Sequence, residues 1–355
     1  MRTQTSLRAR DWQKATRTTT STSAVPPDAQ RQWLPDTELP GYELLPIPLP
    51  DEPTYAMEPE GSLVATLVRR SHPMSRRAVL YVHGWSDYFF QRHLADEMAG
   101  LGYDFYAVDL RRYGRSLRDR QLAGYIANLS DYFTELDEAL EVVRSEGHDD
   151  VVLMGHSTGG LTASLWAHER PGAFSAVVLN APWLELQANS LLRPATQPVL
   201  SAARAVAPTT ALPQLDTGFY RRCISSSEEG EWDYNLNLKG DPAFLIRVGW
   251  MAAILDGHAR VAAGLSIDCP VLVAISARSD FRRSWDEGFR LADIVLDVDR
   301  IASRAPKLGD LVVIARIPDA MHDLVLSRTD VRERVFSEYS RFLTAYAPEA
   351  DRAAN

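Results

Sequence analysis

Gly155-His156-Ser157-Thr158-Gly159 is a G-x-S-x-G pentapeptide, and it directly follows the apolar run 151–154. Turn-forming residues precede that run, and residues 161–170 are typical of a helix. The serine is therefore expected at a sharp turn between a short buried strand and a helix, which lifts its hydroxyl out of a sheet. The alternative is a glycine-rich helix start with Ser157 as a simple cap. The strand before the serine and the helix after it favour a nucleophile.

Composition limits the class of protein. The chain has 355 residues, 45% hydrophobic and 24% charged, with a formal net charge of −9, as in an ordinary soluble globular protein. This acidic balance indicates no nucleic-acid partner. No apolar run approaches the ~20 residues that cross a bilayer, so no transmembrane segment is expected. The two cysteines, Cys223 and Cys269, lie far apart without metal-type spacing. They favour free thiols, a cytoplasmic location and no metal site.

Strand and helix patterns alternate along most of the chain. Apolar strands are expected at residues 63–68, 78–82, 105–110, 151–154, 176–179, 271–276 and 311–317. Helices are expected at residues 91–101, 129–146, 161–169 and 331–346. Apolar strands without internal alternation, separated by helices, predict an α/β fold with a mostly parallel central sheet and helices on both faces.

Two segments depart from this alternation. Residues 1–60, with a basic, polar start and a proline-rich continuation, predict a disordered or extended N-terminal segment. Residues 182–264 are helical and irregular and separate two predicted strands, which indicates a cap inserted over the edge of the sheet. The α/β domain is therefore expected over residues 61–346, with 347–355 as a C-terminal tail.

A serine hydroxyl becomes an effective nucleophile when a histidine takes its proton and a carboxylate orients that histidine. In enzymes whose nucleophilic serine stands at a strand-to-helix turn of this kind, the three catalytic residues follow one another along the chain in the order serine, acid, histidine. Of the eight histidines, only His322 lies C-terminal to the predicted cap. It follows the predicted strand 311–317, and reacting groups gather at the C-terminal ends of strands in an open α/β sheet. We therefore expect His322 to be the base.

The acid has three candidates. Asp280 directly follows the predicted strand 271–276, which is the simplest position for it. Asp293 precedes an apolar pair and a helix that leads to the last strand, and it stands 29 positions before His322, enough for one helix and one strand. The sequence favours Asp293 over Asp280, with Asp297 third. On this reading, residues 281–291 are a small insertion, and Asp280 is an ordinary turn residue.

Ester and amide chemistry at a serine also requires two N–H donors that stabilise the developing oxyanion. One is expected to be the backbone amide of Thr158, directly after the nucleophile. The other is expected from the loop after the predicted strand 78–82, where His83-Gly84-Trp85 stands. The amide of Trp85 is the predicted donor, and His83 is expected to be a structural hydrogen-bonding residue beneath the loop.

Four stretches together resemble the α/β-hydrolase superfamily, and most closely its monoacylglycerol lipase and lysophospholipase-like branch. They are His83-Gly84-Trp85-Ser86-Asp87, the D-x-R-x-x-G-x-S stretch 109–116, the pentapeptide 155–159, and Met321-His322-Asp323. The resemblance covers about residues 61–346. It implies an α/β-hydrolase fold with a cap, and it implies that stretch 109–116 shapes the sheet edge beside the site.

The chain departs from that family at two places. A tryptophan, Trp85, occupies the oxyanion-loop position where small residues are common, which affects the width of the acyl pocket. The acid segment carries the insertion at 281–291. The predicted cap is also rich in aromatic residues: Trp183, Phe219, Tyr220, Trp232, Tyr234, Phe244 and Trp250. They are expected either to line an acyl or aryl pocket, with Trp183 and Trp250 as substrate-binding residues, or to form the cap's own core.

These residues predict a cofactor-free serine hydrolase that cleaves a small-molecule carboxylic ester of an apolar acyl or aryl group through an acyl-enzyme. The same residues would serve a thioesterase, an amidase or an acyltransferase. Outside catalysis, the alternative is a ligand-binding homologue that kept the fold without turnover. The sequence leaves the oligomeric state open.

Overall fold

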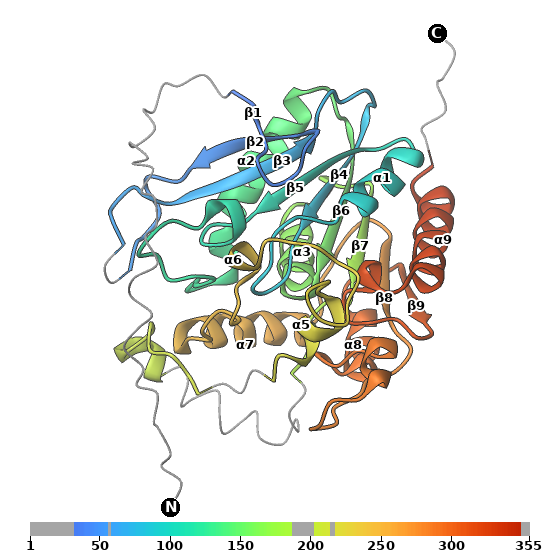
Figure 1. Cartoon of the computed structure of the whole chain (residues 1–355). Coiled ribbons are helices and arrows are strands. Elements are labelled where there is room, and N and C mark those ends of the chain that lie inside the picture. The colour runs from blue at the N-terminus through green and yellow to red at the C-terminus, as the bar shows by residue number, and fades with distance from the viewer. Residues whose placement is uncertain (1–31, 56–57, 187–201, 214–216, 349–355) are drawn as a thin grey trace, which may run out of the picture. The chain divides into compact units, whose positions relative to one another are not determined.

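A nine-stranded sheet organises the part of the chain that the computed structural model describes, which is residues 32–55, 58–186, 202–213 and 217–348 (Figure 1). Its strand order is β1-β2-β3-β5-β4-β6-β7-β8-β9. The strands are β1 (Leu34–Pro35), β2 (Tyr42–Pro48), β3 (Val64–Arg70), β4 (Arg77–Val82), β5 (Asp104–Asp109), β6 (Asp150–His156), β7 (Ala176–Asn180), β8 (Val271–Ser276) and β9 (Val312–Ile317). The pairs from β1 to β3 and the pair β3–β5 are antiparallel, whereas all pairs from β5 to β9 are parallel. The mostly parallel sheet predicted from the apolar runs is confirmed.

Helices cover both faces of this sheet, as the near-continuous apolar strands require. The main helices are α1 (Arg92–Gly100), α2 (Phe133–Ser145), α3 (Ser157–Glu169), α7 (Val248–Ala263), α8 (Val298–Arg304) and α9 (Thr329–Tyr346). Apolar residues of α2, α3, α7 and α8 pack in one buried cluster with alternate strand residues such as Leu80 and Leu153. Those of α1 and α9 pack in another, with the intervening residues such as Val79 and Val152. The fold is that of an α/β hydrolase.

The first strands lie within a segment that the sequence predicts as extended. β1 and β2 extend the sheet beyond β3, although β2 contains Pro46 and Pro48. The two-residue β1 pairs only with Glu43 and Leu44, so both prolines lie where β2 is the edge of the sheet. A proline is tolerated at an edge because the missing N–H has no partner strand there. This edge position is why a proline-rich segment can form a strand.

The connection between β7 and β8 contains the predicted cap. Its helices include α5 (Phe219–Ile224), α6 (Leu236–Lys239) and α7 (Figure 1). Residues 187–201 and 214–216 of the predicted cap lie outside the described residues. None of the described helices is both long enough and apolar enough to cross a membrane.

The D-x-R-x-x-G-x-S stretch after β5 is held by buried ion pairs. Arg111 pairs with Glu135 of α2 at 3.0 Å, and Arg112 pairs with Glu58 at 2.7 Å. The side chains of Arg112 and Glu58 are 1% and 0% exposed. Glu58 also accepts the N–H of Leu122 at 2.8 Å. These contacts fasten the segment before β3 to the loop after β5.

Replacement of Glu58 tests this fastening. Glu58→Gln leaves the buried Arg112 guanidinium without its counter-charge, so we expect a loss of about 3–5 kcal/mol in the free energy of unfolding. Glu60→Gln is the matched control, because Glu60 is exposed and its loss should change stability by less than about 0.5 kcal/mol. Chemical denaturation of both variants measures the difference. Equal denaturation midpoints would show that the ion pair does not hold this segment.

Candidate active site

Ser157 stands at the turn between β6 and α3 and is the first residue of α3. Its φ of 52° lies in the left-handed region, which non-glycine residues rarely occupy. The neighbouring glycines permit this turn. A Cβ on Gly155 would lie 2.8 Å from the Gly159 carbonyl oxygen, and one on Gly159 would lie 2.1 Å from the carbonyl oxygen of His83. The strand and the helix can therefore approach as closely as they do only if both positions lack a side chain.

The structure brings Ser157, His322 and Asp293 together in one hydrogen-bonded chain. The Ser157 Oγ lies 3.0 Å from His322 Nε2, and His322 Nδ1 lies 2.9 Å from Asp293 Oδ2. The three residues are 7%, 3% and 0% exposed, in that order. With Nδ1–H donated to the carboxylate, Nε2 is free to accept the serine proton.

The other two acid candidates lie elsewhere in the hydrogen-bond network. Both carboxylate oxygens of Asp280 accept from Arg282 Nε, at 2.9 and 3.0 Å. Asp297 caps the N-terminus of α8 by accepting the N–H groups of residues 299 and 300. In contrast, Asp293 Oδ1 accepts the N–H groups of Val295 and Leu296, which leaves Oδ2 for the histidine. The structure therefore places Asp293, and neither of the others, within hydrogen-bond reach of His322.

The segment between Asp280 and Asp293 leaves the end of β8 and returns to it. The Asp280 N–H donates to the Asp293 carbonyl at 2.9 Å, and the Asp293 N–H donates to the Arg278 carbonyl at 3.0 Å. Residues between them include the 3-10 helix η3 (Glu287–Leu291). The excursion explains how an aspartate so far along the chain still lies at the C-terminal end of β8.

A buried polar network that the sequence reasoning did not identify anchors the loop of His322. The Asn180 side chain donates to Asp323 Oδ1 at 2.7 Å and accepts the Leu324 N–H at 3.1 Å. Gln91 donates to the other oxygen of Asp323 at 3.3 Å. Asn180 is a polar residue that ends a buried strand, and Asp323 directly follows His322. In the sequence, only these two positions could have pointed to the network.

The predicted oxyanion donors, the amides of Thr158 and Trp85, belong to segments that lie next to Ser157. Thr158 is the second residue of α3, so its N–H belongs to the first turn, which has no partner within the helix. A Cβ on Gly84 would lie 3.2 Å from the Ser157 Cβ, so the loop that carries Trp85 runs against the serine. Beneath this loop, His83 bonds the Gly84 carbonyl through Nδ1 at 2.8 Å and accepts the Leu110 N–H through Nε2 at 3.1 Å. His83 has the structural position expected from the sequence.

Two further side chains border His322. The ring of His156 lies 4.9 Å from that of His322, and its Nδ1 bonds the Asn180 carbonyl at 3.0 Å. Burial lowers the pKa of His156, so its ring stays neutral beside His322. Tyr220 of α5 packs edge-on against His322 with ring centroids 5.7 Å apart. Helix α5 therefore covers the histidine, a contact that the sequence did not reveal.

The aromatic residues of the predicted cap separate into two groups. Trp250 packs against Trp85 at 4.0 Å and against Trp183 at 6.0 Å between ring centroids. The backbone N–H of Trp183 donates to the Ser157 carbonyl at 3.0 Å, which places this residue beside the serine. Phe244 also packs against Trp85, at 6.0 Å. The remaining cap aromatics, Phe219, Tyr220, Trp232 and Tyr234, belong to a different apolar cluster.

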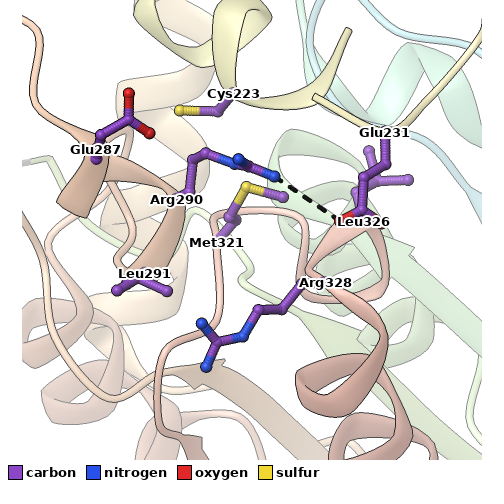
Figure 2. Close-up of a pocket in the computed structure, with 8 residues that line it drawn as sticks. All are labelled: Cys223, Glu231, Glu287, Arg290, Leu291, Met321, Leu326 and Arg328. Atoms are coloured by element: carbon purple, nitrogen blue, oxygen red, sulfur yellow. Dashed lines mark ion pairs between the residues drawn. The ribbon is translucent and has the colours of Figure 1, made fainter. Parts of the chain in front are cut away.

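A cavity of about 290 Å³ lies beside the His322 loop, and Figure 2 shows its lining. The lining residues are Cys223, Glu231, Glu287, Arg290, Leu291, Met321, Leu326 and Arg328. Arg290 and Glu231 face each other across it at 3.8 Å (Figure 2). Burial raises the pKa of the Cys223 thiol to about 12, so this sulfur stays protonated and is a poor nucleophile. Neither Ser157 nor His322 lines the cavity, and within the described part of the chain no cluster of three or more His, Cys, Asp or Glu could hold a metal.

Comparison with curated proteins gives relatives among lipases and phospholipases. A phospholipase of Bacillus subtilis is 31% identical over 111 residues, which are 31% of this chain and 41% of the relative. The monoacylglycerol lipase of Mycolicibacterium smegmatis is 30% identical over 110 residues, 30% of this chain and 38% of the relative. The human monoglyceride lipase is 30% identical over 166 residues, 45% and 51% of the two chains. The chain thus spans about half or less of the length of these relatives.

Solved structures with the same fold cover more of the chain. The monoacylglycerol lipase of Paleococcus ferrophilus superposes with a TM-score of 0.58 at 19% identity, over 79% of this chain and 99% of the other. A monoglyceride lipase of Saccharomyces cerevisiae gives a TM-score of 0.56 at 15% identity, over 84% and 96%. The family model described as serine aminopeptidase, S33 matches residues 73–281. The chain therefore belongs to the serine aminopeptidase S33 family, has the α/β-hydrolase fold, and is similar to monoacylglycerol lipases.

Proposed function

We propose that this chain is a serine hydrolase that cleaves the carboxylic ester of a small apolar acyl or aryl substrate. The observation that carries the proposal is the hydrogen-bonded chain Ser157–His322–Asp293, with distances of 3.0 and 2.9 Å, at a left-handed strand-to-helix turn. A serine held in this strained conformation beside a histidine and a buried carboxylate is the arrangement that activates a hydroxyl. Membership in the serine aminopeptidase S33 family, together with similarity to a monoacylglycerol lipase, supports a serine hydrolase.

In the proposed mechanism, the three residues act together in two half-reactions. Ser157 Oγ attacks the ester carbonyl carbon while its proton passes to His322 Nε2, and Asp293 stabilises the imidazolium that forms. The histidine then gives the proton to the departing alcohol oxygen, and the C–O bond of the ester breaks to leave an acyl-serine. Water repeats the sequence, with its proton passing through His322, and releases the carboxylic acid. No cofactor is needed for either half-reaction.

The acyl side of the proposed site is aromatic. The amides of Trp85 and Thr158 are the proposed oxyanion donors, and the indole of Trp85 extends into the group with Trp250 and Trp183. Flat rings packed beside the nucleophile would exclude water and contact an apolar acyl or aryl group. Trp183 and Trp250 are accordingly the proposed substrate-binding residues.

Covalent labelling separates this proposal from its alternatives. A fluorophosphonate probe should label the parent protein at Ser157, whereas a ligand-binding homologue without turnover would stay unlabelled when well folded. Competition between p-nitrophenyl esters, acyl thioesters and anilides would then rank esterase, thioesterase and amidase activity. Added alcohols would reveal acyl transfer.

The first variant tests the nucleophile. Ser157→Ala should abolish fluorophosphonate labelling and lower p-nitrophenyl acetate turnover by ~10⁴- to 10⁶-fold, because the reacting oxygen is gone. Ser164→Ala on the same helix is the matched control, since its hydroxyl only bonds the Gly160 carbonyl. Retention of substantial turnover by purified Ser157→Ala would remove the serine from the mechanism.

The second variant tests the acyl pocket. Trp85→Ala retains the backbone N–H but removes the indole, so we expect the ratio of p-nitrophenyl octanoate to acetate turnover to rise by roughly 10-fold. Trp232→Ala serves as a control, because Trp232 stacks on His93 in the other aromatic cluster. An equal collapse on both esters, with the melting temperature unchanged, would give the indole a direct catalytic role instead.

The third comparison tests the acid. Asp293→Asn should lower kcat by up to ~10⁴-fold, because the side-chain oxygen would keep accepting the N–H groups of Val295 and Leu296 and the NH2 group would face His322 Nδ1, which favours the wrong tautomer. Asp280→Asn should stay within several-fold of the parent, since its partner is Arg282. Melting temperatures of both variants separate lost chemistry from unfolding. A dead Asp280→Asn with an active Asp293→Asn would reverse the assignment.

A further inference from the structure

The loop that carries the proposed oxyanion donor is bound to the predicted cap. We refer to residues 83–88 as the oxyanion loop and to residues 235–244 as the latch segment, which includes α6. The Asn235 N–H donates to the Tyr88 hydroxyl at 2.8 Å, at one end of the contact. At the other end, the Phe244 N–H donates to Ser86 Oγ at 3.1 Å. The two segments are thus joined along their length although about 150 residues separate them in the sequence.

Ser86 holds an unfavourable backbone conformation within this contact. Its φ is 50°, in the region that L-residues other than glycine avoid. Its hydroxyl donates to the Lys239 carbonyl at 2.7 Å while it accepts the Phe244 N–H. A Cβ on Gly240 would lie only 2.5 Å from this hydroxyl, so the latch segment approaches Ser86 as closely as a backbone without a side chain allows. Such a conformation persists where surrounding contacts determine it, and here the latch segment supplies them.

A buried ion pair closes the same contact. Lys239 Nζ bonds Asp87 Oδ1, and their side chains are 12% and 3% exposed. Burial acts to raise the pKa of Asp87, but the neighbouring positive groups, Lys239 first among them, bring that pKa below its ordinary value. The ammonium also lies 5.1 and 5.6 Å from the ring centroids of Phe90 and Tyr234. Lys239 is one of three lysines in the whole chain, which otherwise relies on arginine for positive charge.

We propose that Lys239 is a positioning residue that fixes the Trp85 amide for oxyanion stabilisation by latching the oxyanion loop to the cap. This inference rests on the proposed serine chemistry. Lys239 acts at two points, since its ammonium holds Asp87 and its carbonyl holds Ser86, the two residues directly after Trp85. An N–H donor must point at the oxyanion that forms and not at the ground-state carbonyl, so a small rotation of the loop would slow catalysis with little effect on binding. The reactive form of the site thereby requires a docked latch segment.

Lys239→Met tests the latch, because it retains the apolar stem and removes the charge. We expect kcat on p-nitrophenyl acetate to fall ~10- to 100-fold, with KM within about threefold of the parent. Hydrogen exchange of the amides in residues 84–88 should become faster. Lys307→Met is the matched control, since Lys307 is exposed and lies outside both segments. This variant should change neither kcat nor the exchange rate of the amides in residues 84–88.

The double variant Asp87→Asn with Lys239→Met tests whether the unpaired charge of Asp87, and not the loss of the latch, slows Lys239→Met. Lys239→Met alone leaves a buried, unpaired carboxylate, and if that charge caused the defect, removing it would restore kcat. The latch predicts that the double variant stays as slow as the single one and still exchanges rapidly at residues 84–88. Recovery of parental kcat and exchange by the double variant would overturn the proposal.

Hydrogen exchange also separates this inference from the proposed function. If the parent showed no turnover or labelling, the serine chemistry would fail, yet faster exchange at residues 84–88 in Lys239→Met would still support the latch. If exchange at those residues were unchanged, the latch would be overturned whatever the turnover.

Discussion

The turn at Ser157 is the constraint on which the site depends. Ser157, with a φ of 52°, stands between β6 and α3. At this turn the start of α3 packs closely against the end of β6 and against the backbone of Val82 and His83. Gly155 and Gly159 make that approach possible, because a methyl group at either position would collide with backbone oxygen atoms. The conformational cost of such a turn is on the order of 1–3 kcal/mol, and the buried sheet on which it is built offsets that cost.

Around this turn, the sheet collects groups that are distant in the sequence. Because β4, β6, β7, β8 and β9 run parallel, their C-terminal ends share one edge. The oxyanion loop follows β4, Ser157 follows β6, Asn180 ends β7, and the segments with Asp293 and His322 follow β8 and β9. The Asn180–Asp323 contact then fixes the last of these loops against its neighbours.

Buried charge recurs in the contacts that join segments to the sheet. Arg111, Arg112 and Lys239 each pair with a carboxylate that is largely or fully buried. Breaking such a pair is costly because the remaining charge cannot recover its hydration, so each pair specifies one arrangement of its loop. The first two pairs join stretch 109–116 to α2 and to the segment before β3. The third joins the predicted cap to the loop that carries Trp85.

The sequence by itself determined the fold class, nearly every element of the sheet core, and the positions of Ser157 and His322 as candidates, because apolar periodicity and the strand–serine–helix pattern are local signals. It favoured Asp293 over Asp280 without deciding between them. Only the tertiary structure placed the Asp293 carboxylate against His322 and that of Asp280 against Arg282, since an excursion of the chain that returns to its starting strand leaves no periodic trace. The proline-containing β2, the Asn180–Asp323 network and the Lys239 latch likewise depend on contacts between distant segments, which no local pattern encodes.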